Sequence, residues 1–248
     1  MIVKTMSPEE IRKECIQAIE EVKTRAFKIL ENSKSIKRFI KDRNKCYCFN
    51  KQKYYYFKYF TLTSKNNNTV LILPKYNVDT KEFNLTAYVL YDFGSGIYAA
   101  HITYNSSNMY RKSIQIFTPH YLDRFKERSL NNKDINKFDV LLEITKSFSE
   151  LGSDNKITCI KFEGSSISKD LLEKLKSKYP GNHIIYPVKD RGISICEVNL
   201  STNYDIVIFK TFLSLDILKS DQKTDLDSMV NITEIRNNLL KTIKKERV

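Results

Sequence analysis

The spacing of turn residues between residues 54 and 117 constrains the fold of this chain more than any other feature. Aromatic and β-branched residues are concentrated in the segments 54–63, 69–73, 83–91, 97–104 and 112–117, with short polar turns between most of them. Such segments are typical of strands. Short turns between consecutive strands favour antiparallel pairing. We therefore predict an antiparallel meander over this part of the chain.

A helical pattern precedes the predicted strands. Ser7 can cap a helix, Pro8 suits the first helical position, and Glu10 completes a capping box. Apolar residues then recur at helical spacing over residues 11–30. A helix ending near residue 32 is therefore expected, and the basic stretch 34–45 is expected to contain a second, shorter helix.

The second half of the chain combines helices and strands. Pro119 ends the strand at 112–117 and begins a helix. Further helices are predicted at 132–148, 168–178, 213–222 and 232–245, and further strands at 157–162, 183–188, 193–200 and 205–212. The predicted fold class is therefore α+β: mainly antiparallel sheet or sheets with an N-terminal helix and several packed helices.

We expect residues 1–248 to form a single α+β domain. Its parts would be an N-terminal helical segment (1–45), a sheet-containing core (46–222) and a basic C-terminal helix or tail (223–248). The length alone is compatible with one large domain or two small ones. Long flexible linkers are not expected, because the chain has only 6 Gly and 5 Pro.

The formal net charge of +13 favours polyanionic partners, namely RNA, another nucleic acid or an acidic protein. Part of this charge can also reflect AT-rich coding, because the chain is rich in Lys, Asn, Ile and Tyr. No apolar run approaches the roughly 18–20 residues that span a bilayer. The first residues lack the apolar region of a secretory signal. We expect no membrane partner and a cytoplasmic location, and the oligomeric state is left open.

The cysteines and histidines do not indicate a metal centre. The five cysteines are scattered and odd in number, unlike a disulfide framework. Cys46 and Cys48 are too close together for a zinc knuckle, and the three histidines lack a nearby carboxylate cluster. The sequence also lacks a phosphate loop and a dinucleotide fingerprint. We therefore expect no metal and no cofactor.

The most chemically specific segment contains His120, Arg124 and Arg128. Residues four apart on a helix drift by only about 40° around its axis, so the three side chains can share one side. Two arginines at that spacing repel each other unless an anion lies between them, and a guanidinium binds phosphate well. A histidine beside them can act as general acid or base.

A second interpretation of the same segment stays open. Asp123 and Glu127 lie close enough in sequence to neutralise the arginines, and His120 can simply cap the helix. The segment would then be an ordinary charged helix face in contact with solvent.

The pattern Thr118-Pro119-His120, then Arg124 and Arg128, resembles a segment of the barnase–EndoU–RelE-like group of ribonucleases and toxins. The resemblance extends to a later Gly-led strand, here starting at Gly192, and to a strand carrying a late threonine.

The resemblance implies metal-independent RNA cleavage. It assigns His120 as the acid or base, Arg124 and Arg128 as phosphate binders, and Thr211 as a further catalytic-site candidate. This chain is more than twice as long as the small toxins, and a strand–helix–strand segment at 157–188 lies between the two motifs.

Two other features bear on function. His101, in a predicted strand, could pair with His120, or could be an ordinary strand residue. The run 54–59, with Lys53 and Lys58, mixes aromatic and basic groups as single-stranded nucleic acid platforms do. The same run can equally be a core strand with tyrosine hydroxyls at its rim.

These observations predict a basic intracellular protein that is a metal-independent, toxin-like RNA-cleaving nuclease. The alternative is a non-enzymatic module that binds nucleic acid or another protein. Whether the chain is an enzyme is open at this point.

Overall fold

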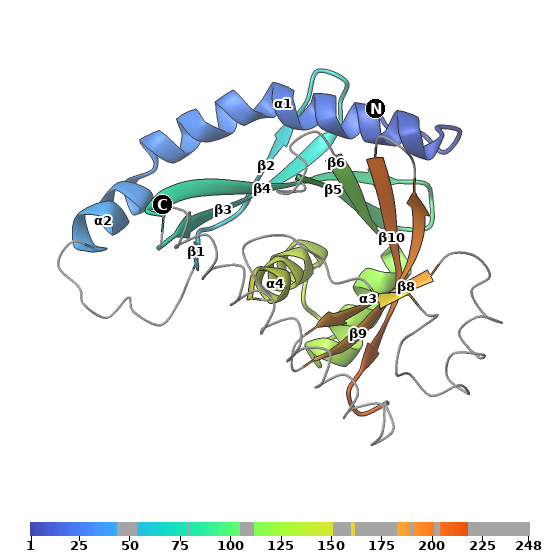
Figure 1. Ribbon diagram of the computed structural model, residues 1–248. Helices are drawn as coiled ribbons and strands as arrows, with labels where there is room; N and C mark the ends of the chain where they lie inside the picture. The colour runs from blue at the N-terminus through green and yellow to red at the C-terminus, as the bar shows by residue number, and fades with distance from the viewer. Residues whose placement is uncertain are drawn as a thin grey trace, which may run out of the picture. The chain divides into compact units, whose positions relative to one another are not determined.

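The computed structural model describes residues 1–43, 54–78, 80–104, 112–150, 160–161, 183–188, 191–200 and 204–217. The chain divides into two compact units, Met1–Ile102 and Thr103–Val248, whose described residues are coloured blue to green and green to orange in Figure 1. Helices occur together with mostly antiparallel strands, so the predicted α+β class is confirmed. The single-domain organisation stays a prediction.

The first unit begins with two helices, α1 (Pro8–Asn32) and α2 (Lys34–Arg43). The capping box at the start of α1 is present: the Ser7 hydroxyl accepts the N–H of Glu10 at 3.3 Å, and the Glu10 carboxylate accepts the N–H of Ser7 at 2.7 Å. One face of α1 is buried and packs on strands of the same unit. Its buried residues are Ile11, Cys15, Ala18, Val22, Ala26 and Leu30.

The strands of the first unit are β1 (Tyr54–Tyr56), β2 (Phe60–Thr63), β3 (Thr69–Asn77), β4 (Glu82–Asp92) and β5 (Ile97–Tyr104). Both β1 and β2 pair with β3, which pairs with β4, which pairs with β5. Every one of these pairings is antiparallel, so the predicted meander is confirmed from β1 to β5.

The strand predicted at 54–63 is interrupted. Tyr56 is opposite Lys75 and Phe60 is opposite Ile72, so three residues of one strand face two of the other. Pro74 lies at this point and has no N–H to donate, although its carbonyl still accepts the N–H of Phe57 at 2.9 Å. The extra residue and the missing donor together explain why one predicted strand becomes two.

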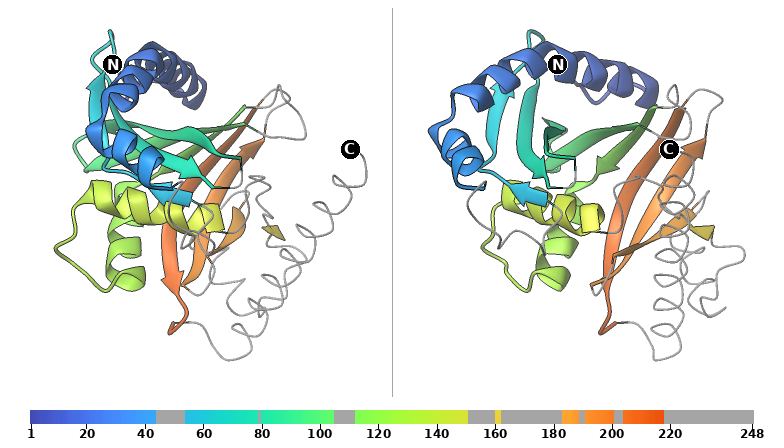
Figure 2. Two further views of the ribbon diagram at one scale, coloured as in Figure 1. Left: turned by 90° about the vertical axis from the view of Figure 1, so that its left-hand side faces the viewer. Right: turned by 60° about the vertical axis from the view of Figure 1, so that its left-hand side comes forward.

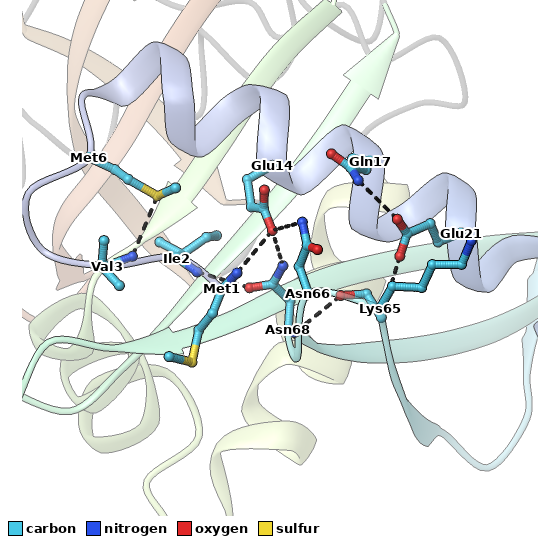
Figure 3. A network of polar contacts seen from close by, with 11 residues as sticks. Met1, Ile2, Val3, Met6, Glu14, Gln17, Glu21, Lys65, Asn66 and Asn68 are labelled. Carbon is cyan, nitrogen blue, oxygen red and sulfur yellow. Dashed lines mark hydrogen bonds and ion pairs between the residues drawn. The ribbon is translucent and has the colours of Figure 1, made fainter.

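A polar network fixes α1 to the turn between β2 and β3 (Figure 3). The carboxylate of Glu14 accepts the side-chain amides of Asn66 at 3.0 Å and Asn68 at 2.6 Å, and Glu21 accepts the N–H of Lys65 at 2.8 Å. Burial raises the pKa of Glu14, but the hydrogen bonds outweigh it and hold that pKa below its usual value. The carboxylate of Glu14 is therefore ionised when it holds the turn.

The second unit contains two helices and five strands in the described residues. They are β6 (Lys112–Phe117), α3 (Pro119–Ser129), α4 (Lys137–Glu150), β7 (Ile160–Lys161), β8 (His183–Val188), β9 (Gly192–Leu200) and β10 (Tyr204–Ser214). The strand order is β6-β10-β9-β8-β7. Strand β10 is antiparallel to β9 but parallel to β6, a pairing that the turn signals did not predict.

Four predicted helices differ from the structure at their start or lie outside the described residues. The helix predicted from 132 begins at Lys137, because the Asn136 side chain accepts the N–H groups of Phe138 and Asp139. The helix predicted at 213–222 is wrong at its start: Leu213 and Ser214 end β10, and a turn follows. The described residues do not include the predicted helix 168–178 or the C-terminal segment 223–248 with its predicted helix 232–245. They also do not include Cys46 and Cys48.

Buried aromatic side chains form the core between α3 and β10. The rings of Phe117 and Phe209 stack with centroids 4.4 Å apart. The Tyr121 hydroxyl lies 2.9 Å from the hydroxyl of Ser194 on β9. The aromatic core, as we call it, consists of Phe117, Tyr121, Phe125, Phe209 and Phe212. This core fixes the helix that carries the candidate site to the strand beneath it.

Candidate functional site on α3 and β10

The junction between β6 and α3 positions His120. The Thr118 hydroxyl caps α3 by accepting the N–H of Tyr121 at 3.2 Å, and it donates to the carbonyl of Phe209 at 2.9 Å. Pro119 occupies the first helical position. Thr118, two residues before His120, therefore connects the end of β6, the start of α3 and β10.

The structure brings His120 and Thr211 together. The His120 side chain is exposed, and its Nε2 lies 3.5 Å from the Thr211 hydroxyl, which belongs to a residue only 5% exposed. In the pairing of β10 with β9, Phe209 and Thr211 are opposite consecutive residues, so Lys210 is an extra residue. Such a bulge redirects side chains, and here it lies beside Thr211.

Arg124 is engaged by its own helix. Its Nη1 lies 2.9 Å from the Glu127 carboxylate, and the two side chains are 39% and 37% exposed. Asp123 pairs instead with Lys137 at 3.9 Å. The Arg124–Glu127 contact is the neutralised arrangement that the sequence left open. Because the pair is accessible to water, it is weak.

Arg128 contacts the backbone of β10. Its Nη1 donates to the carbonyl of Phe212 at 2.8 Å. His120 and Arg128 thus reach neighbouring residues, Thr211 and Phe212, from opposite ends of α3. The stripe predicted on α3 therefore meets β10 at two points, while Arg124 between them pairs with Glu127. The catalytic and phosphate-binding roles of all four residues stay predictions.

A further group of charged residues was not found from the sequence. Arg191, just before β9, donates to the Ser129 hydroxyl at 3.3 Å and lies 3.5 Å from the Glu143 carboxylate, which also binds Lys146 at 2.6 Å. This group joins the ends of α3 and β8 to α4. Glu143 and Lys146 are three residues apart on α4, but Arg191 and Ser129 come from other parts of the chain, so no sequence pattern could show the whole group.

His101 belongs to the first unit, on β5. Its Nδ1 lies 2.9 Å from the carbonyl of Ala87, which can only accept, so Nδ1 carries the proton. The ring centroid lies 5.1 Å from that of Tyr88. Burial lowers the pKa of His101 to about 4, although the hydrogen bond to Ala87 opposes this and nearby Lys75 reinforces it. His101 is therefore neutral near pH 7, and its pairing with His120 stays a prediction.

The neutral state of His101 predicts a pH effect on stability. A histidine whose folded pKa lies below its unfolded value of about 6.5 stabilises the fold above that pH and destabilises it as the pH falls toward 4. We compare the wild type with His101→Gln, whose side chain keeps a donor but does not titrate. Between pH 7 and pH 4, the free energy of unfolding of the wild type should fall by up to about 3 kcal/mol more than that of the variant. Urea unfolding at several pH values measures this, and parallel curves for the two proteins would contradict it.

Comparisons of the chain with protein-family models, with curated proteins and with solved structures find no match. The resemblance to the barnase–EndoU–RelE-like group therefore stays a prediction. No helix in the described part of the chain combines the length and apolar character that crossing a membrane requires.

Proposed function

We propose that the α3–β10 site gives this chain an RNA-directed, nuclease-like function that needs no metal. The observation that carries the proposal is the contact between the exposed His120 imidazole and Thr211, 91 positions apart in sequence. A histidine within reach of a phosphodiester can transfer the proton of the attacking or leaving hydroxyl. The Thr211 hydroxyl would orient the imidazole or donate to a phosphate oxygen.

A second candidate is a nucleic-acid-binding protein that does not cleave. The observation that favours it is that both arginines of α3 have partners, Glu127 for Arg124 and the Phe212 carbonyl for Arg128. Each partner occupies Nη1 of its arginine, so a phosphate would have to bind through the remaining N–H groups or displace that partner. The Arg124 pair is the weaker of the two, because it is open to water.

Cleavage of fluorescently labelled RNA in the presence of EDTA tests the first candidate. We expect cleavage by the wild type and a loss of about 100-fold or more in His120→Ala, which is the usual contribution of a general acid or base. Lys126→Ala is the matched control, because it removes a cation from the same helix without touching the His120–Thr211 contact. Its rate should stay within about twofold of wild type, since Lys126 is half-buried, outside the His120–Thr211 contact, and still partly accessible to water.

The outcomes separate the candidates. Salt-sensitive RNA binding without cleavage would reject the nuclease and support the binding protein. Equal cleavage by wild type and His120→Ala would exclude His120 as the catalytic residue. A chain that neither binds nor cleaves RNA, but captures an acidic protein, would overturn both.

A further inference from the structure

Two donors of Thr118 hold the start of α3 to β10. Figure 2 shows α3 in green alongside β10 in orange. The Thr118 hydroxyl donates to the carbonyl oxygen of Phe209 at 2.9 Å, and the Thr118 N–H donates to the same oxygen at 3.3 Å. The Lys210 carbonyl is farther from the hydroxyl, at 3.5 Å, and a hydroxyl has only one hydrogen to donate. Phe209 is therefore the point at which Thr118 fixes β10.

The pairing of β6 with β10 stops just before the candidate site. Its last pair is Phe117 with Phe209, after which β6 gives way to α3 and β10 contains the extra residue Lys210. A bulge interrupts the ladder and lets a strand bend. The aromatic core also holds α3 against β10, but apolar contacts are not directional, whereas a hydrogen bond restricts distance and angle. The bonds of Thr118 therefore set the geometry of this junction.

His120 and Thr211 lie at equal distances along the chain from this junction. His120 follows Thr118 by two residues, and Thr211 follows Phe209 by two residues. The contact between His120 Nε2 and the Thr211 hydroxyl, at 3.5 Å, is at the long end for a hydrogen bond. A small displacement of Phe209 relative to Thr118 would therefore be enough to break it.

The same hydroxyl also orders the first turn of α3. It accepts the N–H of Tyr121, the residue after His120, at 3.2 Å. Pro119, the residue before His120, has its φ restricted by its ring. The Tyr121 hydroxyl lies 2.9 Å from that of Ser194, which holds Tyr121 from the other side. The backbone on both sides of His120 is therefore held, while its imidazole is exposed.

We propose that Thr118 is the positioning residue of the α3–β10 site. Its hydroxyl acts through Phe209 and through the first turn of α3, and it keeps the His120 imidazole within reach of Thr211. The effect on catalysis rests on the proposed nuclease-like function. The effect on the placement of His120 does not, so the two effects are measured separately.

Nitrogen NMR of the imidazoles tests the placement of His120 without a substrate. The full chain carries isotope-labelled histidine, and His120→Ala identifies the His120 signals. Thr118→Val keeps the shape of the side chain but removes the hydroxyl, whereas Thr118→Ser retains it. Ser7→Ala is the matched control, because it removes the hydroxyl that caps α1 in the first unit. Thermal unfolding of each variant checks that the protein is folded at the temperature of measurement.

We expect Thr118→Val to move the His120 Nε2 signal toward its position in Thr211→Val, which lacks the contact. Thr118→Ser and Ser7→Ala should keep the wild-type position. If Thr211→Val moved the signal but Thr118→Val did not, Thr118 would not position His120. A signal that neither substitution moves would mean that the His120–Thr211 contact does not form in solution, and the proposal would be wrong.

Cleavage of labelled RNA tests the effect on catalysis. We expect Thr118→Val to lower kcat by about 10- to 100-fold, because a displacement of about 1 Å can cost about 100-fold. KM should stay within about threefold, because Thr118 acts through His120. In a Thr211→Val background the same substitution should cost about threefold or less, since the contact is already lost. Thr118→Ser should recover most of the wild-type kcat, and Ser7→Ala should keep it within about twofold.

The kinetic results separate a positioning role from a purely structural one. Equal losses of kcat from Thr118→Val with and without Thr211 would contradict the proposal, because Thr118 would then not act through that contact. A loss in Thr118→Ser as large as in Thr118→Val would also contradict it. A wild type that does not cleave RNA would reject the proposed function, and the NMR comparison would still decide whether Thr118 positions His120.

Discussion

Replacing Gly192 by alanine is expected to destabilise the second unit by about 4 kcal/mol or more, a loss typical only of severe clashes. Gly192 has a φ of +144°, which L residues rarely adopt. A Cβ at this position would lie 2.0 Å from the carbonyl oxygen of Leu213 and 2.9 Å from the Cα of Ser214. Both are backbone atoms of β10, so the clash can be relieved only by opening the β9–β10 pairing.

Gly94→Ala is the matched control for this substitution. Gly94 also has a positive φ, +87°, but a Cβ there would meet nothing within 4 Å. Gly94→Ala should therefore lower the free energy of unfolding only through its unfavourable backbone conformation, by about 1 to 2 kcal/mol. Urea unfolding of both variants measures the difference. Similar losses at the two glycines would show that the contact with β10 does not matter.

Truncating Phe209 to alanine is expected to cost about 3 to 5 kcal/mol, the usual range for a buried phenylalanine. Phe209 is fully buried, stacks on Phe117 at 4.4 Å and meets Tyr121 edge-on at 5.2 Å. Phe209 lies two residues before Thr211, so its truncation should change both the near-ultraviolet circular dichroism of the aromatic core and the geometry of the candidate site.

Ile208→Ala provides the comparison for Phe209. Ile208 is the preceding residue of β10 and is only half-buried, so its truncation should cost about 1 kcal/mol. Urea unfolding of both variants measures the difference. If the two variants unfolded at the same urea concentration, Phe209 would not contribute more to stability than Ile208.

The parts of the fold that the sequence predicted well depend on neighbours in sequence. The capping box of Ser7 and Glu10 fixes the start of α1, and Thr118 with Pro119 fixes the start of α3. The β3–β4–β5 meander follows from strand patterns separated by short turns. In each case all the interacting residues lie within one short stretch of chain.

The parts that the sequence did not predict depend on distant segments. The parallel pairing of β6 and β10 joins strands whose facing residues are 92 positions apart, and hydrophobic pattern gives no information on such partners. The extension of β10 through Ser214 has the same origin, since Leu213 and Ser214 are held by β9. A helical pattern of apolar residues at 213–222 could not show this pairing.

The candidate site was predicted in part. The sequence placed His120 at a helix start and Thr211 on a late strand, and the structure brings the two side chains together. The partner of Arg128 could not be predicted, because it is a backbone carbonyl and every residue has one. The sequence did not decide whether Arg124 binds Glu127 or an external anion. In the structure its partner is Glu127.

The position of β10 between β6 and β9 has a consequence for how the chain is made. The meander of the first unit joins neighbours in sequence and can form while synthesis continues. Strand β10, by contrast, is the last described strand to leave the ribosome. Until residues 204–214 emerge, Tyr121 and Phe125 lack their partners Phe209 and Phe212. The growing chain therefore carries an incompletely covered aromatic helix until β10 is made, and His120 can contact Thr211 only from that point on.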